Sequence, residues 1–146
     1  MSEQARSGDM ASGNPQMPIA RTLGFHFTRR GGGMSELVQP VTEAITFDGV
    51  AVQAGAVATI ADFAGGAAVA SLLPPDWRVT TADMTVKLLA PAVGERLIAR
   101  GQALQTGKTI SVARSDVFAV ADGVETLCAT ALVTLRNSAP PAARAA

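Results

Sequence analysis

The sequence predicts a single α+β domain in which an antiparallel sheet wraps around one long central helix. Residues 54–73 form a run that is apolar nearly all round, which is typical of a helix at the centre of a fold. The segments on both sides alternate between apolar and polar residues, as half-buried strands do. A run of strands around one apolar helix favours a sheet packed over that helix. The chain of 146 residues, 48% of them hydrophobic, has the size and composition of one globular domain.

We expect this domain to cover residues 18–137, between two disordered ends. The leader 1–17 is polar and rich in Gly and Ser, and the tail 138–146 is rich in Ala and Pro. The leader also lacks the apolar stretch of a signal peptide, and without a targeting signal we expect a cytoplasmic protein.

The elements before the central helix are short. Residues 18–25 predict a helix that opens at Pro18 and closes at Gly24, because proline suits the first turn and glycine suits the end. Strands are expected at 25–30 and 34–41, with a turn of three glycines between them.

The central helix 54–73 would be roughly 30 Å long and would end before Pro74. A membrane span is the alternative interpretation. However, Asp62 is the only charged residue of the run and lies near its middle, where a charge is costly in lipid. The small residues suit close approach by a sheet; they are Gly55, Ala58, Ala61, Gly65 and Gly66. We therefore expect a buried helix and no membrane partner.

Four further strands are expected after the helix. They cover residues 80–89, 95–104, 108–121 and 125–136. The pair Asp122-Gly123 favours a tight hairpin between the last two. Because short connections join antiparallel neighbours, these strands predict a meander in chain order.

Composition excludes several classes of function. The 12 basic and 12 acidic side chains balance and no basic stripe stands out, so we expect no nucleic-acid partner.

The single cysteine, Cys128, excludes an intrachain disulfide and a cysteine-rich zinc site. By alternation it shares a face with Thr126 and Thr130, and we expect a packed thiol. With His26 as the only histidine, a histidine metal site or a Ser-His-Asp triad is difficult to assemble, and we expect no metal or cofactor.

Asp62 is the strongest candidate for chemistry. A carboxylate that stands alone on an apolar helix is expected to lose part of its hydration, and desolvation makes a carboxylate a better proton acceptor near neutral pH. The alternative is that Asp62 only bonds a buried donor. Its isolation on the helix favours a functional role.

The start of the same helix is the second candidate. The segment Gln53-Ala54-Gly55 places small residues where free N–H groups point outward, and such groups can polarise a carbonyl oxygen. Asp62 lies roughly 12 Å further along the helix, so the two features of one chain cannot reach one reacting carbon. Two antiparallel helices across a twofold axis can. If Asp62 is catalytic, we therefore expect a homodimer with two shared sites.

Two further segments carry weaker candidates. Thr80 and Thr81 begin the strand after the helix, and a hydroxyl there could hold Asp62 or a water, although an ordinary strand role fits equally well. In the turn Gly107-Lys108-Thr109, Lys108 could meet a phosphate, although an exposed turn lysine is the simpler interpretation.

The helix segment resembles that of the hotdog-fold acyl-CoA thioesterases, in particular the phenylacetate-degradation (PaaI-like) subgroup. Residues 53–66 read QAGAVATIADFAGG, where the subgroup has His-Gly/Ala-Gly, a short apolar run and then Ala-Asp. The strand 79–84 (VTTADM), the turn 89–94 (LAPAVG) and the turn at 107–109 follow in the family's order. The resemblance covers about residues 18–137.

Three positions depart from that subgroup. Gln53 replaces the His, which leaves a hydrogen-bond donor without charge. Phe47 replaces an Asn, although the neighbouring Asp48 could orient a water. Ala90 replaces an Arg that would contact a phosphate.

The resemblance implies an enzyme that cleaves the thioester of a small or medium acyl-CoA or aryl-CoA to the free acid and CoA. Asp62 would act as general base or nucleophile, with Thr81 near the attacking water. The N–H of Ala54 or Gly55 of the partner chain would hold the oxyanion. The candidates for substrate contacts are Asp48, Thr80, Gly107, Lys108 and Thr109. Family members form homodimers that pair into tetramers, so a dimer of dimers is implied.

Two other functions stay open. Phe47 and Gln53 motivate a module that binds acyl-CoA without cleaving it, as a sensor or carrier. Hydration of an enoyl-CoA is a third hypothesis, for which His26 is poorly placed in the sequence.

Overall fold

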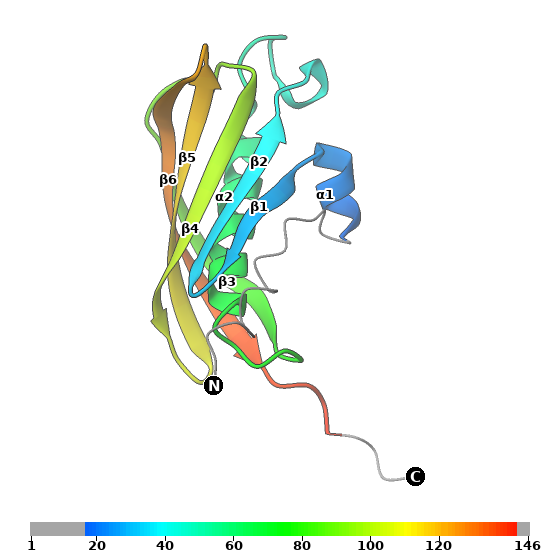
Figure 1. Ribbon diagram of the computed structural model, residues 1–146, viewed down its shortest axis with the longest axis vertical. Helices are drawn as coiled ribbons and strands as arrows, with labels where there is room; N and C mark the ends of the chain where they lie inside the picture. The colour runs from blue at the N-terminus through cyan, green and yellow to red at the C-terminus, as the bar shows by residue number, and fades with distance from the viewer. Residues whose placement is uncertain (1–16, 143–146) are drawn as a thin grey trace, which may run out of the picture.

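The computed structural model describes residues 17–142, which form a curved sheet with one long helix on its inner face (Figure 1). The elements in chain order are α1 (Pro18–Leu23), β1 (His26–Gly31), β2 (Met34–Pro40), the 3-10 helix η3 (Glu43–Ile45), α2 (Ala54–Ala70), β3 (Arg78–Leu88), β4 (Arg96–Thr106), β5 (Ile110–Ala121) and β6 (Val124–Ser138). The predicted α+β class and the hotdog arrangement are confirmed. Residues 1–16 and 143–146, which belong to the predicted leader and tail, lie outside the described residues.

Local sequence signals set several of these boundaries. Helix α1 has Pro18 in its first turn, and Gly24 ends it in the left-handed conformation at φ 82°. Asp122 and Gly123 have φ values of 50° and 76°, and two positive values are what a tight hairpin between β5 and β6 requires. Each strand expected from the sequence overlaps the one observed.

Helix α2 ends at Ala70, earlier than the predicted Leu73. The cause is Ser71, which caps the helix. Its hydroxyl donates to the carbonyl oxygen of Ala68 at 2.7 Å and accepts from the N–H of Gly33 at 2.8 Å. This pair of bonds fixes the end of the helix to the turn between β1 and β2.

The predicted meander in chain order is wrong for β3. The sheet order is β1-β2-β4-β5-β6-β3, with every pair antiparallel, so β3 lies beside β6 at the far edge. The connecting segment 89–95 can reach roughly 20 Å, which exceeds three strand spacings of about 5 Å each. Its first residue bonds to the first part of β6 and its last to the end of β5, through Leu89 N to Cys128 O and Glu95 N to Val120 O. The connection therefore crosses two strands instead of turning back.

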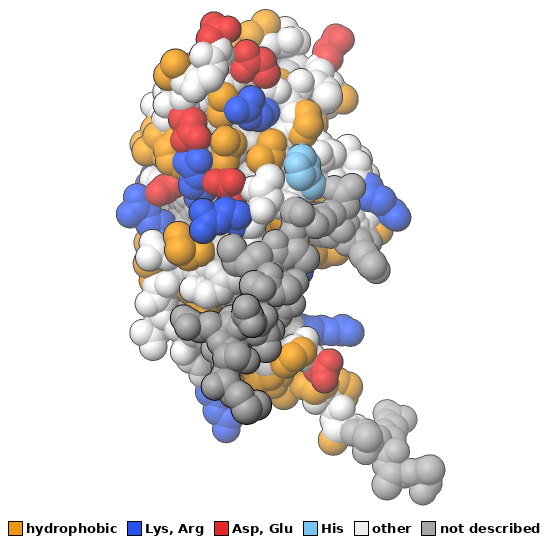
Figure 2. Space-filling model, in the orientation of Figure 1, with side chains coloured by type: hydrophobic (Ala, Val, Ile, Leu, Met, Phe, Trp, Pro, Cys, Tyr) orange, Lys and Arg blue, Asp and Glu red, His pale blue; other side chains and the backbone are white. Residues whose placement is uncertain are grey.

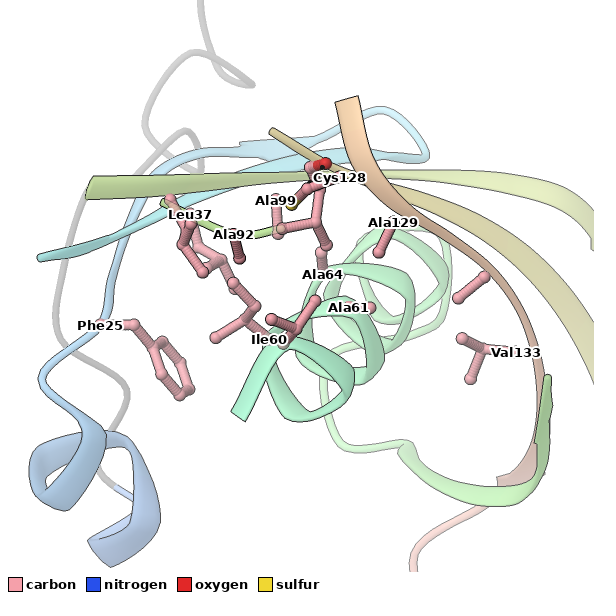
Figure 3. Close-up of a cluster of buried hydrophobic side chains, with 14 of the residues drawn as sticks. Phe25, Leu37, Ile60, Ala61, Ala64, Ala92, Ala99, Cys128, Ala129 and Val133 are labelled. Carbon is pink, nitrogen blue, oxygen red and sulfur yellow. Dashed lines mark hydrogen bonds between the residues drawn. The ribbon is translucent and has the colours of Figure 1, made fainter. Parts of the chain in front are cut away.

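The inner face of the sheet and α2 form the core through small side chains. Ile60, Ala64 and Ala68 of α2 are fully buried against the sheet. Gly101 of β4 lies so close to the carbonyl oxygen of Ala64 that a methyl group there would collide with it. Figure 3 shows side chains from the sheet, from α2 and from Phe25 after α1 meeting in this cluster.

Cys128 is buried in the same cluster, so its predicted place on the face of Thr126 and Thr130 is wrong. A bulge interrupts the pairing of β5 and β6 between Val117 and Phe118, and it breaks the alternation at this point of β6. The expectation of a packed thiol holds, because the Cys128 thiol donates to the carbonyl oxygen of Val117 at 3.3 Å.

The outer face of the sheet carries a charged cluster. Arg100 donates to Glu36 at 2.9 Å and binds Glu125 through two hydrogen bonds of 2.7 and 2.8 Å. Figure 2 shows acidic and basic side chains interspersed on the face that it presents. None of the helices among residues 17–142 is long and apolar enough to cross a membrane.

Candidate active site

Asp62 lies in the middle of α2, where β3 passes the helix. The hydroxyl of Thr81 donates to its Oδ1 atom at 2.6 Å, which is one of the roles that the sequence left open for Thr80 and Thr81. Thr81 pairs with the buried Leu135 and so faces the helix, whereas Thr80 pairs with Arg136 and points to the opposite face. A bulge between Thr81 and Asp83 follows directly. The structure thus places Thr81, and not Thr80, at the carboxylate.

Within residues 17–142, nothing bonds the second oxygen of the Asp62 carboxylate. Asp62 is half-buried, and none of the ion pairs of the described residues involves it. The only side chain that bonds it among residues 17–142 is the Thr81 hydroxyl, on Oδ1. A carboxylate that is oriented through one oxygen and open at the other is suited to accept a proton from water or to attack a carbonyl carbon.

The start of α2 differs from the expectation at one of its two amides. Gln53 caps the helix, and its Oε1 atom accepts hydrogen bonds from the N–H of Gly55 at 2.6 Å and of Ala56 at 3.3 Å. The Gly55 amide, which we expected as a possible oxyanion donor, is therefore already bonded to Gln53. The N–H of Ala54 donates to no acceptor within residues 17–142. Ala54 thus presents the free amide of this helix end.

A cavity of about 410 Å³ opens beside Ala54. Its walls come from the loop before α2, the first turn of α2, the end of β3 and the crossing segment after β3. Phe47, Ala54, Leu88, Leu89 and Cys128 are among its lining residues. Sequence reasoning missed this cavity because the crossing of the chain from β3 to β4 creates it. The only local signal was the apolar run at 88–93.

Asp48 holds the loop at the mouth of this cavity. Its Oδ1 atom accepts from the N–H of Ala51 at 2.7 Å and of Val50 at 2.8 Å. These bonds hold the pKa of the Asp48 carboxyl below its usual value. Asp48 was expected at the substrate, and in the single chain it shapes the loop that carries Phe47.

The Gly107-Lys108-Thr109 turn lies at the other end of the sheet from the loop before α2 (Figure 1). The side chain of Asn137 donates to Gly107 O at 2.7 Å, and its backbone N–H donates to Thr109 O, also at 2.7 Å. Lys108 is exposed. One chain therefore does not bring Lys108 to the cavity, and the turn lies nearer to the start of β3.

The candidate residues of one chain thus form two separate groups. One holds Asp62 and Thr81, and the other holds Gln53, Ala54 and the cavity. The two groups are roughly 12 Å apart along α2, which is too far for one reacting carbon to meet both. No group of three His, Cys, Asp or Glu side chains in the described part of the chain could hold a metal ion.

Comparisons with known proteins identify the family of this chain. The sequence profile of the thioesterase superfamily matches residues 52–126, a range that includes Gln53, Ala54, Asp62 and Thr81. A Halobacterium salinarum protein named as a candidate esterase is 37% identical over 105 residues, which are 68% of this chain and 69% of that protein.

Two solved structures share the fold of this chain. A thioesterase family protein from Silicibacter pomeroyi has a TM-score of 0.82 and 34% identity, and the match covers 86% of this chain and 92% of that one. The PaaI protein of the Escherichia coli phenylacetic acid degradation operon has a TM-score of 0.72 and 19% identity, with 84% and 86% covered. At 19% identity the second likeness shows the fold and does not assign the subgroup.

Proposed function

This chain belongs to the thioesterase superfamily, and from that premise we propose that it hydrolyses the thioester of a small or medium acyl-CoA or aryl-CoA, as its resemblance to the PaaI-like subgroup suggests. One observation carries the proposal. Thr81 orients Asp62 through one carboxylate oxygen and leaves the other open. On the same helix, Ala54 has a free amide and lines an apolar cavity. A carboxylate base and an oxyanion donor are the two groups that thioester hydrolysis needs.

The reaction can follow either of two routes. In the first, Asp62 takes a proton from water, the hydroxide adds to the acyl carbon, the C–S bond breaks, and the proton passes to the leaving CoA sulfur. In the second, Asp62 attacks the acyl carbon and displaces CoA, and water then hydrolyses the mixed anhydride. Thr81 orients the carboxylate in both.

We place the oxyanion at the amide of a second chain. Strand β3 is an edge strand of 11 residues and is largely exposed, and the side of α2 next to it carries the half-buried Asp62. An isologous dimer that covers this edge would set two α2 helices antiparallel, with Ala54 of the partner subunit beside Asp62. The resemblance further suggests that two dimers pair into a tetramer.

The variant Asp62→Asn tests the proposal. We expect a loss of roughly a hundredfold to ten-thousandfold in kcat, the range of a general acid or base, with the melting temperature and oligomer size unchanged. The assay is release of free CoA thiol from a panel of acyl-CoA esters. Asp122→Asn, the same change at an exposed position in the turn between β5 and β6, is the matched control and should keep full activity. Wild-type turnover of the panel by Asp62→Asn would remove Asp62 from the mechanism.

A binding protein without catalysis is the second candidate, and Gln53 favours it. Its side chain accepts hydrogen bonds from the N–H groups of Gly55 and Ala56, so that Ala54 has the one amide of this helix start that is free for an oxyanion. A protein whose melting temperature rises with acyl-CoA esters, while no free thiol appears over hours, would be such a module.

A further inference from the structure

We infer that the cavity at the start of α2 is the acyl subsite and that it selects uncharged acyl groups of medium length, with Phe47 as the residue that closes over them. This inference rests on the proposed thioester chemistry and names its substrate class. The position of the cavity supports it, because Ala54 is one of the lining residues and its amide is free. A thioester carbonyl at that amide would direct its acyl chain into the cavity.

The lining of the cavity decides the polarity of the group that fits. Among its lining residues are Val57 and Cys128, which are 2% and 1% exposed, and the side walls are the leucines at 88 and 89. None of its lining residues is charged. Burial raises the pKa of the Cys128 thiol, which therefore stays neutral and bonded to Val117. A carboxylate at the end of an acyl chain would lose its hydration there without gaining a partner, which is costly.

The volume decides the length of the group. At about 30 Å³ for each water-sized atom, the cavity of about 410 Å³ holds at most roughly fourteen non-hydrogen atoms. An octanoyl chain, or an aryl ring with a short linker, fits within that bound and fills more than half of it. An acetyl group would leave most of the cavity unfilled, and a long fatty acyl chain would extend out of it.

Phe47 is positioned to cover a bound chain. It is 70% exposed, which is unusual for an aromatic side chain on a loop held by hydrogen bonds. The loop is fixed by the bond from Phe47 N to Ala51 O at 3.1 Å and by the two bonds to Asp48. Val50 of the same loop is also exposed, at 58%, and does not line the cavity. Phe47 and Val50 thus form a matched pair for a test.

The first measurement uses Asp62→Asn, so that esters survive during titration. Dissociation constants are measured by calorimetry for acetyl-, butanoyl-, hexanoyl-, octanoyl- and succinyl-CoA. We expect affinity to rise roughly three- to fourfold for each added methylene up to about eight carbons, the value for apolar burial. Succinyl-CoA should bind no better than acetyl-CoA. Equal affinity for all five esters would overturn the inference.

The second measurement changes the cavity itself. Ala90→Leu narrows the cavity and should weaken the binding of octanoyl-CoA at least tenfold, whereas the binding of acetyl-CoA should not change. The control Ala121→Leu adds the same side-chain volume at an exposed position and should change neither affinity. Phe47→Ala should weaken the binding of octanoyl-CoA severalfold, whereas Val50→Ala should leave it unchanged. An equal loss in Phe47→Ala and Val50→Ala would contradict the role of Phe47, even if Ala90→Leu fails to fold.

The inference and the proposed function fail in different ways. If affinity follows acyl length and Phe47 but wild-type protein releases no thiol from any ester, hydrolysis is wrong and the subsite stands. If wild-type protein releases thiol from every ester while affinity ignores acyl length, the subsite is wrong and hydrolysis stands.

Discussion

The two sides of helix α2 are packed very differently. On the side toward the sheet, Ile60, Ala64 and Ala68 are fully buried, and Gly101 of β4 touches the helix backbone. On the other side, Thr59 and Asp62 are only half-buried and Gly55 is exposed. The closely packed side holds the fold together, whereas the open side carries the groups that can do chemistry.

This difference corrects the expectation of a helix that is buried all round. A single chain buries only the side of α2 toward the sheet. The open side is nevertheless almost free of charged residues, with Asp62 as the only one. An apolar surface left open in a single chain is typical of a contact with another molecule. The packing therefore supports the proposed dimer, in which a second α2 covers the open side. It also predicts that changes on one side alter stability and changes on the other alter activity.

The largest effect on stability is expected at Gly101. A methyl group there would collide with the carbonyl oxygen of Ala64, and backbone on both sides cannot easily yield. We expect Gly101→Ala to lower the free energy of unfolding by about 3 kcal/mol, at the upper end for overpacking. Urea unfolding followed by circular dichroism measures it.

Gly66→Ala is the matched control for that change. A methyl group at Gly66 meets its nearest neighbour, Leu135, at 3.7 Å, which is ordinary contact. Because alanine is the better helix former by about 1 kcal/mol, stability should stay level or rise. Equal losses in the two variants would mean that the sheet side of α2 is not closely packed at Gly101.

A smaller effect, on activity alone, is expected at Thr81. Thr81→Val removes the hydroxyl that orients Asp62 and should lower kcat about tenfold, or about 1.4 kcal/mol, with KM nearly unchanged. Thr81→Ser retains the donor and should restore most of the rate. A loss in Thr81→Ser as large as in Thr81→Val would show that the methyl group matters and the hydrogen bond does not.

The smallest effect is expected on the outer face, at Glu36. Burial disfavours its charge, but hydrogen bonds from Arg100 and Thr28 outweigh burial and hold the pKa of Glu36 below its ordinary 4.5. Because the pKa is lower in the folded state, the resulting stability is present above pH 4.5 and is lost as the pH falls through the folded pKa. Glu36→Gln should therefore cost up to about 1 kcal/mol at pH 7, as expected for a partly exposed pair.

Unfolding at several pH values checks this prediction. The stability difference between wild type and Glu36→Gln should shrink as the pH falls below 4.5, while thioester hydrolysis at pH 7 stays the same. A difference that grows as the pH falls would contradict the sign of the shift.

Local patterns made one part of the molecule predictable and left another part hidden. Helix α2 and its single charge at Asp62 follow from residues near one another in the sequence. The place of β3 depends on which strand it pairs with, and that choice is made by packing across the whole sheet. The capping by Gln53 depends on a side-chain conformation, and the cavity depends on the crossing of the chain after β3. Neither leaves a periodic signal.

Complementation between two inactive variants tests the shared site most directly. Asp62→Asn removes the carboxylate, and Ala54→Pro removes the free amide. Proline is suited to this position, because Ala54 is the first residue of α2 and Gln53 before it has the extended conformation, φ −65° and ψ 141°. Ala54→Ser keeps the amide and is the control.

Each variant alone should be nearly inactive. When equal amounts are unfolded and refolded together, about half of the dimers are mixed, and each mixed dimer has one intact site out of two. The shared site therefore predicts that the mixture recovers about a quarter of wild-type hydrolysis. A mixture that is no more active than its two components, although mixed dimers are present, would show that the two halves of the site do not come from different chains.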